Sequence, residues 1–109
     1  MTEQEAVRSL AALAQQTRLQ IFRLLVVTGT EGMNPSRLSE ELGVPSSALS
    51  FHLKELTHAN LITQERDGRN LIYRASFSNM NDLLSFMTAN CCAGDTCEVQ
   101  DSTAACTNC

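Results

Sequence analysis

The sequence predicts a mainly helical domain with one β-hairpin, arranged as a winged helix-turn-helix. Two short amphipathic helices, over residues 35–42 and 46–58, are joined by a brief turn at Gly43. This spacing alone fits a helix-turn-helix and an ordinary pair of bundle helices equally well. Two β-rich runs follow directly, on either side of Asp67-Gly68, the dipeptide most typical of a tight hairpin. Because a hairpin directly after the second helix of a helix-turn-helix is a wing, the winged helix is the favoured fold.

The two helices before this motif are predicted from caps and apolar periodicity. Thr2 and Glu5 have the spacing of a capping box, which opens the first helix. Its expected apolar face is Ala6, Leu10, Leu13 and Ala14. Thr17 and Gln20 repeat the box and are expected to open the second helix. Apolar residues surround much of this helix, so we expect it to be the central buried one.

The remaining elements carry equally local signals. Asn34 as N-cap and Pro35 at the first helical position open the third helix. Leu49, Leu53 and Leu56 form the inward face of the fourth helix, and Leu71, Tyr73 and Ala75 share one face of the returning strand. The last helix is expected to open at Ser78, with an apolar stripe formed by Met80, Leu83, Leu84, Met87 and Cys91.

Length and charge limit the possible classes of protein. A chain of 109 residues with 43% hydrophobic residues supports one compact core, which we assign to residues 1–90. The polar N-terminus and the short apolar stretches predict a cytoplasmic protein without a membrane span. The net charge is −4, but all eight basic residues precede Cys91, whereas Asp95, Glu98 and Asp101 follow it. The nearly neutral body can therefore still carry a local basic surface for nucleic acid.

All five cysteines lie in the segment 91–109, which we treat as a separate cysteine-rich tail. Thiols stay reduced in the cytoplasm, so clustered cysteines are more often metal ligands or redox groups than structural disulfides. An odd number of cysteines also fits poorly with a fully paired disulfide framework.

Three segments together resemble the ArsR/SmtB family of bacterial metal-sensing repressors. These are SLAALAQQTRLQIFRLLV, SALSFHLKELTHANLI and ERDGRNLIYRAS, which occur in the family's order and spacing over residues 8–77. The resemblance implies a dimeric winged helix that binds double-stranded operator DNA and releases it when a metal ion binds. It also implies a homodimer interface made by the first and last helices. The cysteine-rich C-terminus is similar to members that sense trivalent arsenic.

Two departures from the family concern the metal. The best-known arsenic site has cysteines in the stretch that here reads SEELGVPSS, where Ser39 and Gly43 offer no thiol. The zinc sensors use Asp and His pairs on the last helix, which here has Asp82 and no histidine. Only the tail is left to sense a soft metal.

A DNA-reading surface is expected on the fourth helix and the hairpin. The candidate residues are Ser46, Ser47, Ser50, Phe51, His52, Lys54, Arg66 and Arg69. Small hydroxyls near a helix N-terminus suit phosphates and base edges, although Ser46 or Ser47 is expected to cap the helix. Ser50 is expected to contact DNA because its family counterpart does. Phe51 either touches a thymine methyl or packs under the wing. His52 is the weaker DNA candidate, and the arginines flanking the hairpin turn are expected to reach phosphates or a narrow minor groove.

The tail offers two kinds of metal site. Trivalent arsenic binds three thiolates, which Cys91, Cys92 and Cys97 supply, with Gly94 and Asp95 favouring a turn between them. As(III) is thus the expected effector, and Sb(III) has similar chemistry. The rival is a four-thiolate zinc or cadmium site formed by Cys92, Cys97, Cys106 and Cys109.

Other roles for the thiols stay open at this point. Cys106 and Cys109 can be a second soft-metal pair, a redox pair or spare thiols, and Cys91 can be an interface residue. A repressor that senses redox state through tail disulfides is a further possibility. A thiol enzyme or metal carrier is disfavoured, because no histidine lies near the tail in sequence to activate a thiol.

Overall fold

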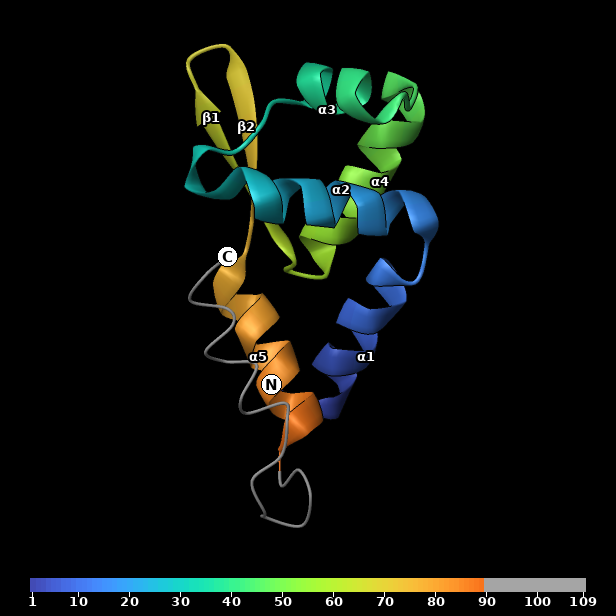
Figure 1. The fold of residues 1–109 in the computed structure, drawn as a ribbon, viewed down its shortest axis with the longest axis vertical. Helices are drawn as coiled ribbons and strands as arrows, with labels where there is room; N and C mark the ends of the chain where they lie inside the picture. The colour runs from blue at the N-terminus through green and yellow to red at the C-terminus, as the bar shows by residue number, and fades with distance from the viewer. Residues whose placement is uncertain (90–109) are drawn as a thin grey trace.

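The computed structural model describes residues 1–89. Its elements are α1 (Glu3–Leu13), α2 (Gln16–Thr28), the 3-10 turn η1 (Gly29–Glu31), α3 (Pro35–Leu42), α4 (Ser46–His58), β1 (Ile62–Asp67), β2 (Asn70–Ala75) and α5 (Phe77–Thr88). The hairpin and α3 lie at one end of the molecule, α1 and α5 lie at the other, and α2 crosses between them (Figure 1). This arrangement is the winged helix-turn-helix that the sequence predicts.

α1 begins at the predicted capping box. Thr2 Oγ1 accepts a hydrogen bond from Glu5 N at 3.1 Å, and Glu5 Oε1 accepts one from Thr2 N at 3.2 Å. The hydrogen bond that the Thr2 backbone N–H donates to the Glu5 carboxylate favours its charged form and is the main cause that lowers the pKa of Glu5. The predicted apolar face is only partly right, because the buried residues of α1 are Ala6, Ser9 and Ala12. Small side chains allow close packing here, whereas Leu10 is 41% exposed.

α2 is the central helix, as predicted, but it begins earlier than expected. It contacts α1, α3, α4, β2 and η1, and it buries Ile21, Phe22 and Leu25. The N-cap is Gln15, whose Oε1 accepts a hydrogen bond from Arg18 N at 2.8 Å. The expected opening at Thr17 is therefore wrong, because Thr17 already lies within the helix. Val27 is 82% exposed, so not all apolar residues of α2 are buried.

The helix-turn-helix follows the predicted boundaries. Asn34 Oδ1 caps α3 by accepting from Arg37 N at 2.8 Å, and Gly43 ends it in the left-handed conformation with φ 65°. Leu49, Leu53 and Leu56 of α4 are buried, as expected. The N-cap of α4 is Pro45, whose side chain has no hydrogen-bonding group. Capping by Ser46 or Ser47 was expected and is wrong, because both already lie inside the helix.

The hairpin is tight and is joined to the helical body. Asp67 pairs with Asn70, so Gly68 and Arg69 form the two-residue turn. Tyr73 and Ala75 of β2 are buried on one face, as predicted, while Leu71 is partly buried. An isolated bridge pairs Met33, in the loop before α3, with Tyr73, through backbone hydrogen bonds of 2.9 Å in both directions. The loop thus adds one more pairing to the outer edge of β2.

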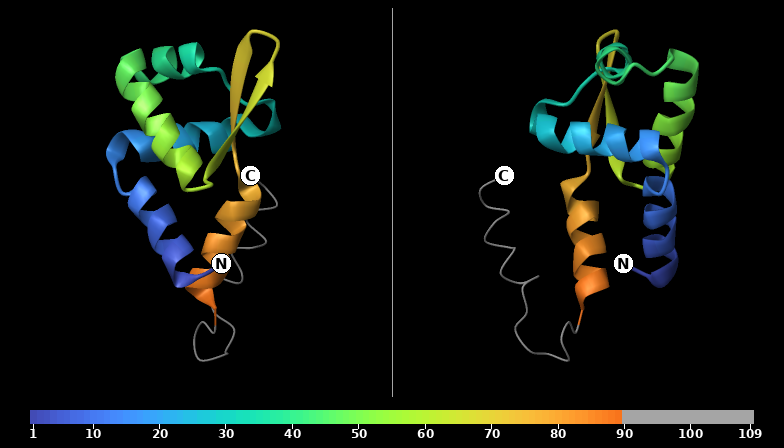
Figure 2. Two further views of the ribbon diagram at one scale, coloured as in Figure 1. Left: turned by 180° about the vertical axis from the view of Figure 1, so that it is seen from behind. Right: turned by 45° about the vertical axis from the view of Figure 1, so that its right-hand side comes forward.

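α5 begins at Phe77, one residue before the predicted Ser78. Ser76 is the N-cap, and its Oγ accepts a hydrogen bond from Asn79 N at 3.4 Å. Leu83 is the buried residue of the predicted stripe, and Cys91 lies outside the described residues. Figure 2 shows α5 beside α1, which it contacts, below α2. Within residues 1–89 no helix is long and apolar enough to cross a membrane.

Candidate nucleic-acid interface

α4 presents a continuous polar face to solvent. Ser46, Ser47, Ser50, Phe51 and Lys54 are all exposed, whereas the leucines of the opposite face are buried. Positions three and four apart lie on the same side of a helix, so these five side chains form one strip along the N-terminal two thirds of α4. The strip combines hydroxyls, one aromatic ring and one cation, which is the chemistry needed to contact both base edges and phosphates.

Ser50 is oriented by its own helix. Its Oγ donates a hydrogen bond to the Ser46 carbonyl at 3.0 Å. With this proton engaged, the lone pairs of the hydroxyl oxygen remain as acceptors. In this rotamer Ser50 can accept a hydrogen bond from a base amino group. To donate a hydrogen bond to a phosphate, its hydroxyl must first break the bond to the Ser46 carbonyl.

Phe51 is half exposed on the same strip. The exposed fraction of the residue is 50%, and its ring centroid lies 5.6 Å from that of His52 on the same helix. Half of the residue thus remains accessible on this face. An exposed apolar ring on this face can meet a thymine methyl group.

His52 faces the body of the domain rather than the exposed strip. Its Nδ1 lies 3.4 Å from Arg18 Nη1, at the start of α2, and the contact is partly buried. Arg18 Nε also donates to the Ala12 carbonyl at 2.7 Å, close to the end of α1. Sequence reasoning missed Arg18, because the two residues of this contact are 34 positions apart and no local pattern connects them.

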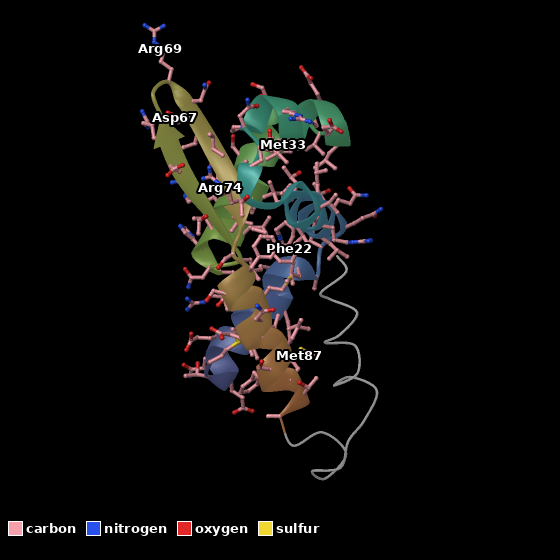
Figure 3. The ribbon with its side chains drawn as sticks, turned by 60° about the vertical axis from the view of Figure 1, so that its left-hand side comes forward. Phe22, Met33, Asp67, Arg69, Arg74 and Met87 are labelled. Carbon is pink, nitrogen blue, oxygen red and sulfur yellow. The ribbon has the colours of Figure 1, made fainter. Side chains whose placement is uncertain are left out.

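The wing carries its free cations at the tip. Arg66 and Arg69 are exposed, and Figure 3 shows Arg69 projecting from the end of the hairpin, away from the domain. Glu65 is paired with Arg74 at 3.0 Å, and Arg74 Nε donates to the Thr30 carbonyl at 2.7 Å. Of the two acids beside the tip, only Asp67 thus remains to balance the arginines. The tip keeps an excess of positive charge.

A hollow joins α4 to the wing. It has a volume of ≈ 260 Å³, and its polar lining includes Ser50, Lys54, His58 and Gln64. The exposed strip of α4 and the outer strand surface therefore border one concave surface, as a winged helix that follows a nucleic-acid groove requires.

The metal-binding expectation falls outside this surface. Residues 1–89 contain no group of three or more His, Cys, Asp or Glu residues placed to hold a metal ion. The proposed thiolate ligands Cys91, Cys92 and Cys97, and the further pair Cys106 and Cys109, all lie outside the described residues.

Comparison with known proteins identifies the family. Residues 13–65 match the family of helix-turn-helix domains. An ArsR protein of Halobacterium salinarum is 42% identical over 60 residues, which are 55% of this chain and 46% of that protein. The arsenical resistance operon repressor of Bacillus subtilis is 42% identical over 74 residues, covering 68% of this chain and 69% of that protein. This chain belongs to the ArsR/SmtB family of transcriptional regulators.

Solved structures of ArsR-like proteins share the fold. An ArsR-like transcriptional regulator from Rhodococcus superposes with a TM-score of 0.70 at 27% identity, covering 95% of this chain and 91% of that chain. A homodimeric winged helix-turn-helix DNA-binding domain from Mycobacterium bovis has a TM-score of 0.65 at 25% identity, with coverage of 78% and 76%. The match to the H. salinarum relative spans less than half of that protein.

Proposed function

We propose that this chain is a homodimeric repressor that binds operator DNA and releases it when its tail thiolates bind As(III) or Sb(III). The observation that carries the DNA-binding part is the exposed strip of α4 beside a wing with a cationic tip. Direct contacts are assigned to Ser46, Ser47, Ser50, Phe51, Lys54, Arg66 and Arg69. His52 acts mainly by orienting α4, because its Nδ1 is turned toward Arg18.

An uncovered apolar surface on α1 and α5 supports the homodimer. The large exposed apolar side chains of these two helices are Val7, Leu10, Leu84, Phe86 and Met87. Apolar surface of this extent on adjacent helices favours association with a matching surface. A two-fold dimer then places two copies of α4 to read half-sites about one helical turn, ~34 Å, apart. The homodimeric state of the M. bovis domain supports the proposed dimer.

The effector assignment depends on the cysteines. We divide the chain into a DNA-binding and dimerisation domain, residues 1–90, and a sensing tail, residues 91–109. Cys91, Cys92 and Cys97 provide three soft thiolate donors, which suit As(III) and Sb(III) and disfavour hard cations. The relatives from H. salinarum and B. subtilis are both named for arsenical resistance. A cytoplasmic location keeps these thiols reduced.

The energy required for release is within reach of such a site. Coupling between an effector site and a ligand site is typically ~1–3 kcal/mol. Two sites in a dimer supply up to ~6 kcal/mol, compared with the ~5.5 kcal/mol needed to change DNA occupancy from nearly full to nearly empty. The tail follows α5, so an effector there acts next to the proposed dimer interface.

One experiment tests the proposal against its rivals. Fluorescence anisotropy of labelled operator duplex is measured with the fully reduced chain while arsenite, antimonite, zinc and cadmium are added in turn. Release by arsenite and antimonite at concentrations where zinc and cadmium have no effect supports the proposal. Release by zinc or cadmium alone supports the four-thiolate site. Release only after an oxidant is added identifies a redox sensor.

A further inference from the structure

A hollow borders the exposed side of α4 on each flank of the helix. Ser50, Lys54 and His58 follow one another at intervals of four residues, so they lie along one line of the helix. All three residues line the hollow on the wing side. His58 also lines a second hollow, of ≈ 560 Å³, whose other walls come from α1 and the start of α2. We call this second hollow the α1-side hollow.

Basic groups dominate the α1-side hollow. Its charged and polar lining residues are Arg8, Arg18, Glu55 and His58, and alanines complete the wall. Two arginines against one carboxylate leave an excess of positive charge. Small alanine side chains keep the hollow open between α1 and α4. These residues come from three helices, so no sequence motif indicates the site.

Arg18 is held in place before any ligand arrives. Its Nε donates to the Ala12 carbonyl at 2.7 Å, and its Nη1 lies 3.4 Å from His52 Nδ1. A guanidinium has five N–H donors, so these two contacts leave further donors for an anion. A side chain that is already ordered loses less conformational entropy on binding.

The geometry of the major groove indicates what this hollow receives. The groove is about 12 Å wide, and a helix inside it lies between two phosphate backbones. When one backbone passes on the wing side of α4, the other must pass on the α1 side. We propose that the α1-side hollow binds a phosphodiester of this second backbone through Arg8, Arg18 and His58. The inference rests on the proposed insertion of α4 into the major groove.

This contact gives α1 two roles. The same helix carries Val7 and Leu10 of the proposed dimer interface and Arg8 of the phosphate site. A displacement of α1 at the interface therefore also changes a DNA contact directly, without first passing through α4.

Arg8→Ala tests the proposal. The probe is a duplex of about 30 base pairs, enough for two half-sites, selected from a random pool by its binding to the full chain. Loss of one charge-assisted contact lowers affinity about tenfold at low salt. It also reduces the slope of log affinity against log salt concentration by about 1 per protomer. Arg8→Lys, which keeps the charge, retains the slope.

Arg23→Ala is the matched control, because Arg23 is an exposed arginine of α2 that lines a different hollow, with Leu19 and Glu41. It is expected to leave affinity and slope unchanged. If Arg8→Ala loses helical circular dichroism, Arg8→Gln replaces it as the test, because Arg8 lines only the α1-side hollow; lower affinity and a smaller salt slope are again the supporting results.

Three results overturn the inference in distinguishable ways. A folded Arg8→Ala variant with wild-type affinity and slope overturns the phosphate site and leaves the proposed function intact. Binding of inorganic phosphate that is lost in Arg8→Ala, with DNA binding unchanged, assigns the hollow to a free anion instead. A wild-type chain that selects no duplex overturns the proposed function, and the inference with it.

Discussion

Arg18 Nη1 lies 3.4 Å from His52 Nδ1, while Nε of the same arginine donates to the Ala12 carbonyl at 2.7 Å. One side chain at the start of α2 thus contacts both α1 and α4, the helix proposed to read DNA. Because a guanidinium is always charged and only donates, the contact requires Nδ1 of His52 to carry its lone pair. Arg18 therefore links α1, a helix of the proposed dimer interface, to the proposed DNA-reading helix.

Removing the histidine acceptor is expected to loosen α4. His52→Ala lowers the free energy of unfolding by about 1 kcal/mol, the size of a partly buried hydrogen bond. His52→Asn, which keeps an acceptor near the position of Nδ1, loses less. Urea unfolding at one fixed protomer concentration measures both variants, because the stability of a dimer depends on concentration. Equal losses in the two variants would show that ring packing, not the contact with Arg18, is what matters.

Gly32 is expected to be much less replaceable than Gly29. Both glycines have positive φ with extended ψ, a backbone region that costs other residues about 1–3 kcal/mol. A Cβ at Gly32 would also lie 2.7 Å from the Tyr73 carbonyl oxygen, whereas one at Gly29 meets no described heavy atom within 4 Å. Gly32→Ala therefore destabilises the fold more than Gly29→Ala in urea unfolding. Equal losses would mean that only the backbone strain counts.

Tyr73 is expected to limit stability at alkaline pH. Burial raises the pKa of its phenol above the ordinary value of 10.0. Its contribution to stability is complete below the unfolded pKa and is lost as pH rises through the raised folded pKa. Tyr73→Phe should therefore lose less of its free energy of unfolding above about pH 10 than the wild type does.

The phenol itself can be followed, since Tyr73 is the single tyrosine and the chain has no tryptophan. Ultraviolet absorbance of the tyrosinate therefore reports its titration directly. A folded-state titration at the ordinary pKa, or parallel alkaline losses in wild type and Tyr73→Phe, contradicts the prediction.

Elements with strong local signals could be predicted from the sequence. The Asn34 cap, the Gly43 stop and the Asp67-Gly68 turn each have a conformational preference that the surrounding structure does not override. These features gave the boundaries of α3 and the hairpin. The buried leucines of α4 followed from the same helical periodicity that predicted its exposed strip.

Features that depend on neighbouring elements could not be predicted. Leu10 is more apolar than Ser9, yet Ser9 is buried, because close helix packing selects small side chains and leaves Leu10 for the proposed dimer contact. Gln15 and Thr17 can both cap a helix, and the sequence does not rank them. The Met33–Tyr73 bridge and the Arg18–His52 contact join distant positions that periodicity does not connect.

The wing tip is expected to contribute charge rather than sequence reading. Arg69→Ala weakens DNA binding about equally on all sequences and lowers the salt slope by about 1 per protomer. Anisotropy titrations over a range of salt concentrations measure both quantities. Arg23→Ala on α2 is the control and should bind like the wild type. An unchanged slope in Arg69→Ala would make the tip a solvated turn.

Truncation before Cys91 is expected to separate DNA binding from sensing. The shortened chain keeps α1 to α5, and thus the proposed reading surface and dimer interface. It should bind operator as a dimer and ignore arsenite. Analytical ultracentrifugation measures the dimer, and anisotropy of labelled operator measures DNA binding and the response to arsenite. A truncated dimer that fails to bind DNA would show that the tail takes part in DNA binding.

Single cysteine replacements give the sharpest test of the sensor. Cys91→Ser, Cys92→Ser and Cys97→Ser should each keep operator affinity and lose most of the arsenite response. A hydroxyl is a far poorer partner for soft arsenic than a thiolate, and a three-ligand ion cannot easily spare one donor. The matched control is the double variant Cys106→Ser with Cys109→Ser, which should respond nearly normally. Anisotropy of labelled operator is followed during arsenite titration, with a reductant that does not chelate arsenic. If the double variant fails while Cys91→Ser responds, the sensor is the distal pair, and Cys91 becomes an interface residue that continues the apolar stripe of α5.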